Sequence, residues 1–275
     1  MAIITLSSDI GLQDYLVGAI KGQLLSQDEK HTIVDITHYL SNTNYPQAAY
    51  ICSNAFKHFP ANTFHILLLN IYATPVTHLL VARFMGQYII CPDNGILTMI
   101  AGERPREIVK LTLPPQAHEL LSITAVVAKA ISYIEKNETF FEQTDLSVTI
   151  VETLPLKPLL AFETIECQII FIDNFENVVL NITKEQFEEQ RRGRPFVILV
   201  SRNEEVTKIS NHYSSVPEGD CLAWFNSAGY LEIAINNGNV ASLFGLQGYH
   251  ENMNKLGMVT QNKHFYHTIK IFFGL

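Results

Sequence analysis

Acidic side chains follow two short apolar runs near the start of the chain, the position at which open α/β sheets bind ligands. Asp9 comes just after the run Ala2–Leu6, and its carboxylate could accept hydrogen bonds from the vicinal hydroxyls of a ribose. Taken alone, Asp9 is more simply interpreted as a helix N-cap. Asp35 and His38 flank the end of the second run. A turn with a satisfied polar network is the simpler interpretation of that pair.

A second group of chemically capable residues lies in the stretch that runs from 171 to 182. Asp173 could pair with an ammonium group, Phe175 could pack against a ring, and Asn177 could hydrogen-bond an amide edge. The alternative is an ordinary hairpin turn, because Asp and Asn are frequent turn residues.

The stretch from 226 to 239 has a turn, a strand-like run and a second turn. Ser227 belongs to the first turn, and Asn236 and Asn237 begin the second. Backbone groups near Asn236 and Asn237 could bind the edge of an adenine ring. Two structural turns are again the simpler interpretation.

Composition narrows the function classes. Of 275 residues, 47% are hydrophobic and 17% are charged, which is typical of a globular chain and not of a disordered one. The net charge of −8 argues against nucleic-acid binding and against anionic membranes. Four scattered cysteines form no CxxC pair, so neither a metal site nor a disulfide framework is expected. No signal peptide and no apolar run of ~18 residues is recognisable, so we expect a cytoplasmic protein.

Common catalytic signatures are missing from the sequence. It contains no GxGxxG, Walker, HExxH or GxSxG motif. The chain therefore lacks the most frequent sequence signatures of nucleotide-binding proteins, metalloproteases and serine hydrolases.

The first half of the chain alternates between strand-like and helix-like segments. This order is typical of parallel βαβ units, so we predict a doubly wound, mainly parallel α/β domain over residues 1–150. The predicted strands are Ala2–Leu6, Thr32–Ile36, Phe64–Asn70 and Tyr88–Cys91. The predicted helices are Asp14–Leu25, Pro46–Phe56 and Ile123–Ile134.

The pattern changes near residue 145. Residues 151–163 contain two prolines and are predicted to be a linker. Short apolar runs joined by Gly, Asn and Pro turns then predict a smaller antiparallel β domain over residues 164–275. Its predicted strands are Ile165–Ile172, Asn177–Ile182, Pro195–Val200, Cys221–Asn226 and Leu231–Asn236, with one charged helix at Lys184–Arg192.

Six of these motifs, taken in order, resemble the S-adenosyl-L-methionine (SAM) hydroxide adenosyltransferases, a family of SAM hydrolases related to the fluorinase and the chlorinase. The motifs are SDIGLQDYLVGAIKG, VDITHYL, TFHILLL, PDNG, IDNFENVVLNI and NSAGYLEIAINNGNVA. The resemblance extends from about residue 3 to about residue 246.

The resemblance implies a fold, an assembly and a reaction. An α/β domain precedes a smaller β domain, and the family forms homotrimers that bind SAM between the first domain of one subunit and the second domain of its neighbour. Water attacks C5′ of the ribose and expels methionine, which leaves adenosine. No cofactor is implied, because SAM is itself the substrate or ligand.

The resemblance also implies site residues. Asp9 matches the acid that binds the ribose hydroxyls. Asp173, Phe175 and Asn177 match a D-x-F-G-N segment that contacts the methionine and adenine parts, although Glu176 replaces its glycine.

Further matches concern the two ends of the ligand. Ser227 matches a residue near the methionine carboxylate, and Asn236 and Asn237 match the segment that reads adenine. Tyr213 lies where an adenine-stacking aromatic is expected, and a core residue of the β domain is its alternative interpretation.

The sequence departs from the family at the reaction centre. Asn70 stands in place of the catalytic aspartate, and the family's arginine falls on or near Thr77. Of a Phe-His-Gly-Arg-Asp segment only His118 is retained. Asn70 can orient a water molecule but cannot act as a base, so His118, or with less support His78, would take the proton. The predicted substrate-binding set also includes Tyr72.

Two functional hypotheses follow. The chain either hydrolyses SAM with a remodelled water site, or it binds SAM or adenosine without turnover, as a sensor or scaffold. A related nucleophile or nucleoside substrate is a third and weaker reading. Loss of a negative charge at Asn70 should reduce selectivity for a sulfonium over neutral adenosine.

Overall fold

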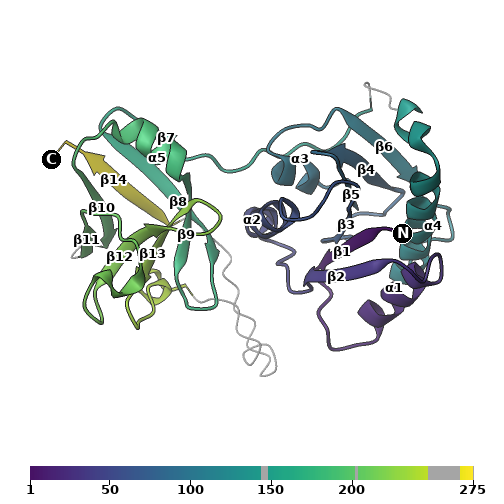
Figure 1. Cartoon of the computed structure of the whole chain (residues 1–275), viewed down its shortest axis with the longest axis horizontal. Helices are drawn as coiled ribbons and strands as arrows, with labels where there is room; N and C mark the ends of the chain where they lie inside the picture. The colour runs from purple at the N-terminus through teal and green to yellow at the C-terminus, as the bar shows by residue number, and fades with distance from the viewer. Residues whose placement is uncertain (144–147, 202–203, 247–266, 275) are drawn as a thin grey trace. The chain divides into compact units, whose positions relative to one another are not determined.

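A computed structural model describes residues 1–143, 148–201, 204–246 and 267–274 of the chain. The chain divides into two compact units, Met1–Pro155 (unit 1) and Leu156–Leu275 (unit 2), each with its own secondary-structure elements (Figure 1). Within the described part of the chain, no helix combines the length and the apolar character needed to cross a bilayer.

Unit 1 is built on a six-stranded sheet with the strand order β2-β1-β3-β5-β4-β6. Parallel pairing joins β2 to β1, β1 to β3 and β3 to β5, whereas β4 is antiparallel to both of its neighbours. The predicted α/β class with a mainly parallel sheet is therefore confirmed. The strands are β1 Ile3–Ser8, β2 Thr32–Thr37, β3 Phe64–Leu68, β4 His78–Phe84, β5 Gln87–Pro92 and β6 Glu107–Thr112.

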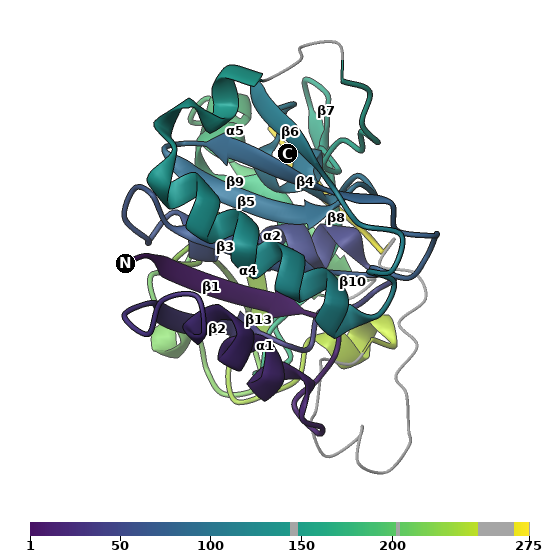
Figure 2. The ribbon, with the colours of Figure 1, turned by 90° about the vertical axis from the view of Figure 1, so that its right-hand side faces the viewer.

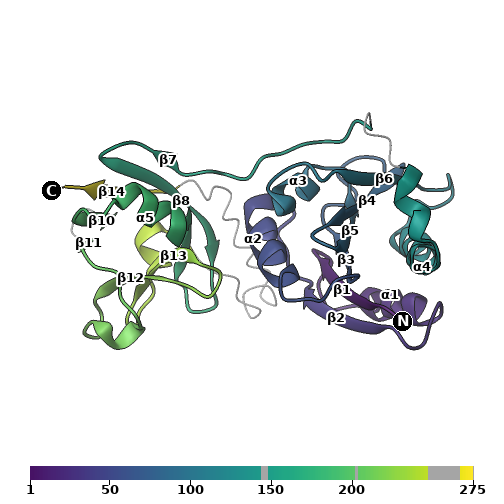
Figure 3. The same cartoon turned by 45° about the horizontal axis from the view of Figure 1, so that its top comes forward.

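Helices cover both faces of this sheet. Figure 2 shows α1 and α4 crossing one face, and Figure 3 shows α2 and α3 on the other. The apolar core has two matching parts, with Ile20 and Ile123 packed on the first face and Ala48 and Leu97 on the second. The helical segments are α1 Leu16–Leu25, α2 Tyr45–Phe56, α3 Ile96–Ala101, α4 Leu120–Lys136 and the 3₁₀ turn η1 Glu138–Gln143.

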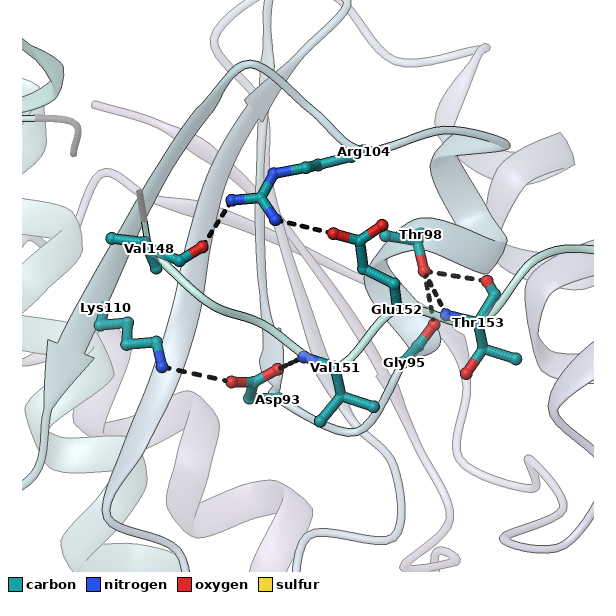
Figure 4. Close-up of polar contacts among 9 residues, drawn as sticks. All are labelled: Asp93, Gly95, Thr98, Arg104, Lys110, Val148, Val151, Glu152 and Thr153. Carbon is teal, nitrogen blue, oxygen red and sulfur yellow. Dashed lines mark hydrogen bonds and ion pairs between the residues drawn. The ribbon is translucent and has the colours of Figure 1, made fainter. Parts of the chain in front are cut away.

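Near the end of unit 1, residues 148–153 form a strap that is hydrogen-bonded to the turn after β5 and to α3 (Figure 4). Asp93 Oδ1 accepts the Val151 N–H at 2.7 Å, and Thr98 Oγ1 both accepts the Thr153 N–H and donates to the Thr153 carbonyl, each at 2.9 Å. Gly95 has φ +92°, and a Cβ there would collide with Thr153 Oγ1. The close approach of the strap therefore requires glycine at that position.

Unit 2 is an antiparallel near-barrel with the strand order β11-β10-β14-β8-β9-β13-β12, and β7 pairs with β8. This confirms the predicted antiparallel β domain. The strands are β7 Leu159–Leu160, β8 Thr164–Ile172, β9 Val178–Thr183, β10 Phe196–Ser201, β11 Glu204–Val206, β12 Cys221–Phe225, β13 Tyr230–Ile235 and β14 Thr268–Phe273.

The charged helix of unit 2 is α5, Lys184–Arg191. A capping box fixes its start, because the Thr183 hydroxyl accepts the Gln186 N–H while the Gln186 side chain accepts the Thr183 N–H. Phe187 anchors the otherwise solvated helix in the barrel core, where it is fully buried. Two 3₁₀ turns complete the unit, η2 Tyr213–Ser215 and η3 Ala241–Phe244.

Candidate functional site

The carboxyl ends of β1 and β3 form the topological switch point of the unit 1 sheet. The chain leaves β1 towards β2 on one side and returns to β3 on the other, and this is where open α/β sheets bind ligands. Asp9 follows β1 and Asn70 lies two residues beyond β3. The structure joins them directly, because Asp9 Oδ2 accepts the Asn70 backbone N–H at 2.7 Å.

Asp9 is not the N-cap of the following helix, which corrects the simpler sequence interpretation. Helix α1 begins at Leu16, and it is Asp14 Oδ1 that accepts the Leu16 N–H at 2.8 Å. The Asp9 carboxyl is half-buried, and burial raises its pKa although the Asn70 N–H opposes the rise. Partial burial of the ionised carboxylate costs hydration free energy, which the hydrogen bond from Asn70 partly offsets.

Asn70 adopts the left-handed backbone conformation, with φ +50°. Asparagine tolerates this conformation better than most residues do. Its Nδ2 donates to the Tyr45 hydroxyl at 3.2 Å, and its carbonyl accepts the Ala73 N–H at 3.1 Å. The side chain is therefore fixed by Tyr45, a residue that sequence reasoning did not select. The remaining amide oxygen can accept a hydrogen bond from water but is not a base.

The loop after β3 lies beside the start of α4. Burial raises the pKa of the Tyr72 hydroxyl, and the nearby Glu119 carboxylate raises it further against an opposing contribution from the Leu120 backbone. His118 immediately precedes Glu119 and is exposed. The structure thus places the segments that contain Tyr72 and His118 next to each other at one edge of unit 1.

Both ring nitrogens of His78 have polar partners within unit 1. Its Nδ1 lies 3.0 Å from Thr77 Oγ1, and its Nε2 lies 2.9 Å from Asp93 Oδ2. The Asp93 carboxylate also lies 3.6 Å from Lys110 Nζ. His78 therefore ties the start of β4 to the turn after β5.

The Asp35–His38 pair belongs to a series of polar contacts that runs from the buried Ser8 to the exposed Asp35. Ser8 Oγ lies 2.7 Å from His38 Nδ1, and His38 Nε2 lies 3.2 Å from Asp35 Oδ1. This order resembles a Ser-His-Asp triad, but the Ser8 hydroxyl is turned to His38 and the residue is only 1% exposed. The His38 carbonyl also accepts the Gly11 N–H at 2.8 Å. These contacts brace the turn that carries Asp9. The expected polar network is satisfied only in part, because the buried His38 Nε2 lies near the Asp35 carboxylate without a well-formed hydrogen bond.

In unit 2, the β8–β9 hairpin is organised by Asp173. Its Oδ1 accepts the backbone N–H groups of Phe175 and Asn177, both at 2.8 Å. Glu176 has φ +62° and so keeps the left-handed conformation that glycine would adopt at this position. Its carbonyl accepts the Ala241 N–H at 3.0 Å. The turn therefore forms with glutamate at this position.

Asn177 connects this hairpin to the neighbouring strands. Its Nδ2 lies 3.0 Å from Asp173 Oδ2, 3.1 Å from the Tyr213 hydroxyl and 3.3 Å from Glu232 Oε1. The Tyr213 hydroxyl donates to Glu232 Oε1 at 3.0 Å. Burial, followed by the Glu232 charge, raises the pKa of Tyr213. The structure thus brings together three of the predicted residues, Asp173, Asn177 and Tyr213.

Glu232 is the principal residue that sequence reasoning missed. It is 4% exposed, and it also accepts the Trp224 Nε1–H at 2.9 Å and the Asn226 Nδ2–H at 3.1 Å. The Trp224 ring packs on the Tyr213 ring at 4.9 Å between centroids. The one available signal was an acidic residue between Leu231 and Ile233 in an otherwise apolar strand.

The other predicted residues of unit 2 lie on its turns. Phe175 is 73% exposed at the hairpin tip, and Ser227 is exposed next to Asn226. Asn236 Nδ2 donates to the Val216 carbonyl at 2.9 Å, and Asn237 is exposed with φ +54°. Among the described residues, no hydrogen bond joins these four side chains to Asn177 or Glu232.

Comparison with known proteins gives the same family for both units. Residues 4–144 match the SAM hydroxide adenosyltransferase N-terminal domain, and residues 167–251 match the C-terminal domain. The (R)-S-adenosyl-L-methionine hydrolase of Methanocaldococcus jannaschii is 26% identical over 89% of this chain and 92% of its own length. The protein of the same name from Thermus thermophilus is 24% identical over 87% and 94%, respectively.

Solved structures share the fold. An uncharacterized conserved protein from Thermotoga maritima superposes with a TM-score of 0.74 at 21% identity, over 98% of this chain and 99% of its own. A conserved hypothetical protein from Thermus thermophilus gives a TM-score of 0.69 at 21% identity, over 99% of this chain and 100% of its own.

Proposed function

The chain belongs to the SAM hydroxide adenosyltransferase family, and from this membership we propose that it binds SAM and hydrolyses it to adenosine and methionine. The observation that carries the proposal is the 2.7 Å bond between Asp9 Oδ2 and the Asn70 N–H at the switch point. One carboxylate thereby holds the loop at the expected reaction centre and retains lone pairs for ribose hydroxyls.

The proposed reaction requires few catalytic groups from the protein. A sulfonium is a good leaving group, so the C5′–S bond breaks with its electron pair on sulfur and needs no general acid. A water oxygen forms the new bond to C5′ once it is held in line and partly desolvated. Asn70 would orient this water, and His118 would take its proton near neutral pH and release it to solvent.

In unit 2, Asp173 and Asn177 would receive the methionine and adenine parts of SAM, with Phe175 and Tyr213 beside them. Ser227, Asn236 and Asn237 would supply the remaining polar contacts, and Tyr72 would contribute from unit 1. Following the family resemblance, we propose a homotrimer in which unit 1 of one subunit and unit 2 of its neighbour complete each site. Light scattering that shows a monomer in solution would contradict this assembly.

The neutral side chain of Asn70 specifically favours a second candidate function, binding of SAM or adenosine without turnover. An amide cannot accept the proton of the attacking water. The two functions are distinguished by whether SAM is converted to adenosine and methionine. Incubation with SAM followed by chromatography should show adenosine and methionine in equal amounts. Thermal stabilisation by SAM with no adenosine above the protein-free blank would instead establish the binding function.

The base assignment has its own test. His118→Ala should abolish adenosine formation, because His118 is the proposed proton acceptor. His58→Ala is the matched control, since His58 is also exposed and lies just beyond α2. Turnover retained by His118→Ala at the rate of the control would remove His118 as the base.

A further inference from the structure

Glu232 is an acid buried in the middle of β13 without a basic partner. Its two carboxylate oxygens receive hydrogen bonds from Asn177, Tyr213, Trp224 and Asn226. Among the described residues no lysine, arginine or histidine forms an ion pair with it. A buried carboxylate is costly unless several donors satisfy it. Four donors drawn from separate segments of unit 2 meet that requirement, and each donor is in turn held in place.

These contacts fix the orientation of the Asn177 side chain. That orientation matters because one end of an amide donates hydrogen bonds and the other end accepts them. Its nitrogen faces three acceptors, Asp173 Oδ2, the Tyr213 hydroxyl and Glu232 Oε1. Rotation of the amide by half a turn would place its oxygen against two carboxylate oxygens and would lose these hydrogen bonds. Asn177 is 2% exposed, so packing and these contacts restrict its side chain. The amide oxygen is therefore the end that is available to another donor.

We propose that Glu232 is a positioning residue, which fixes the Asn177 amide so that its oxygen accepts a hydrogen bond from the exocyclic amino group of adenine. The inference rests on the proposed function, because it requires the purine to lie at Asn177. Glu232 itself does not touch the ligand. A fixed acceptor favours a 6-amino purine and opposes a 6-oxo purine, since two facing acceptors cannot share a proton.

The test measures base selectivity with adenosine and inosine as probes. Dissociation constants from calorimetry should show that the wild-type chain prefers adenosine by at least about tenfold. Glu232→Gln removes one of the two carboxylates that hold the Asn177 nitrogen and introduces an amide that can donate to the rotated oxygen. Asp173 alone then opposes rotation, so the rotated amide becomes populated and can present its nitrogen. We expect this ratio to fall to within about threefold of unity. A merely structural role would weaken both nucleosides equally and leave the ratio unchanged.

A matched control removes a carboxylate elsewhere in unit 2. Glu166 on β8 pairs with Lys270 at 2.8 Å on the surface, so Glu166→Gln should keep the wild-type ratio. Glu232→Gln that melts cooperatively and also keeps the ratio overturns the inference. If Glu232→Gln does not fold, Glu232→Asp replaces it, because the shorter side chain withdraws the carboxylate from Asn177 and keeps the buried charge. A reduced ratio then supports the inference and an unchanged ratio overturns it.

The inference and the proposed function fail in different ways. Wild-type protein that binds neither adenosine nor SAM removes both. Wild-type protein that binds adenosine and inosine equally removes the role of Glu232 alone and leaves SAM binding and hydrolysis standing.

Discussion

The two candidate half-sites are built in opposite ways. In unit 1, the half-buried Asp9 carboxylate is held by one short bond from the Asn70 backbone. In unit 2, the Glu232 carboxylate is 4% exposed and accepts four hydrogen bonds. A saturated acid can only orient its neighbours, whereas an acid with spare lone pairs can meet a ligand. The contrast assigns positioning to Glu232 and direct contact to Asp9.

The largest expected effect is on turnover and comes from the residue that departs from the family. Asn70→Asp supplies a base beside the proposed water. In a His118→Ala background, which lacks the proposed base, it should raise adenosine formation from SAM by about two to three orders of magnitude. Asn62→Asp is the matched control, because Asn62 also has a positive φ, at 63°, and is exposed. An unchanged rate in Asn70→Asp would show that Asn70 does not adjoin the reacting water.

The next effect separates ligand contact from stability. Asp9→Ala removes the proposed partner of two ribose hydroxyls, so calorimetry should show about 100-fold weaker binding of adenosine. Its free energy of unfolding should change by less than about 1 kcal/mol, since partial burial already disfavours the charged form. Asp14→Asn serves as the control for the same loop. Wild-type affinity in Asp9→Ala would contradict the ribose contact.

Glu232→Ala should show that the main effect of this acid is on stability. Removing this acid leaves the polar groups of Asn177, Tyr213, Trp224 and Asn226 without their buried acceptor. We expect the free energy of unfolding in denaturant to fall by about 3 kcal/mol. Glu166→Ala, which breaks a surface pair with Lys270, should cost less than about 1 kcal/mol. Equal losses in the two variants would mean that the Glu232 network is not coupled to folding.

The smallest effect is a pH dependence that originates in Asp9. Its pKa is raised above 3.8 by burial, and ribose binding needs the ionised form. Binding of adenosine should therefore weaken about tenfold for each pH unit below that raised pKa, starting at a higher pH than for an ordinary aspartate. The stability of the free protein depends on pH in the opposite direction. Asp9 contributes most below its unfolded pKa, and that contribution is lost as the pH rises through the folded value.

Asp9→Asn provides the control for this pH dependence, because it removes the titrating group and keeps the side-chain shape. Its affinity for adenosine should be weak and independent of pH over the same interval. A wild-type affinity that is equally flat would exclude Asp9 as the ionisable partner of the ribose.

Local patterns were sufficient for much of the fold. The β-branched and apolar runs of β1, β2 and β3 and the proline at the start of α2 are signals within one segment. Strands β4 and β6 and the C-terminal β14 were not predicted. Strand β14 fills the gap between β10 and β8, which lie far earlier in the chain. Such pairing depends on tertiary contacts that a short window does not contain.

The candidate site residues likewise divide into those with a local sequence signal and those that depend on tertiary contacts. The motif order identified Asp9, Asp173 and Asn177, but the simpler reading of Asp9 as a helix cap was wrong because α1 starts later, at Leu16. Glu232 and Tyr45 were missed for one reason. Glu232 lies 55 residues from Asn177, and Tyr45 lies 25 residues from Asn70. No residue-type pattern within one segment encodes either contact.

Hydrolysis with ¹⁸O-labelled water tests the central claim most directly, because the account places the new bond between a water oxygen and C5′. Purified protein incubated with SAM in labelled water should yield adenosine with one ¹⁸O atom in its 5′-hydroxyl and unlabelled methionine, as read by mass spectrometry. Adenosine without the label, or no adenosine above the protein-free blank, would contradict water attack at C5′ by this chain.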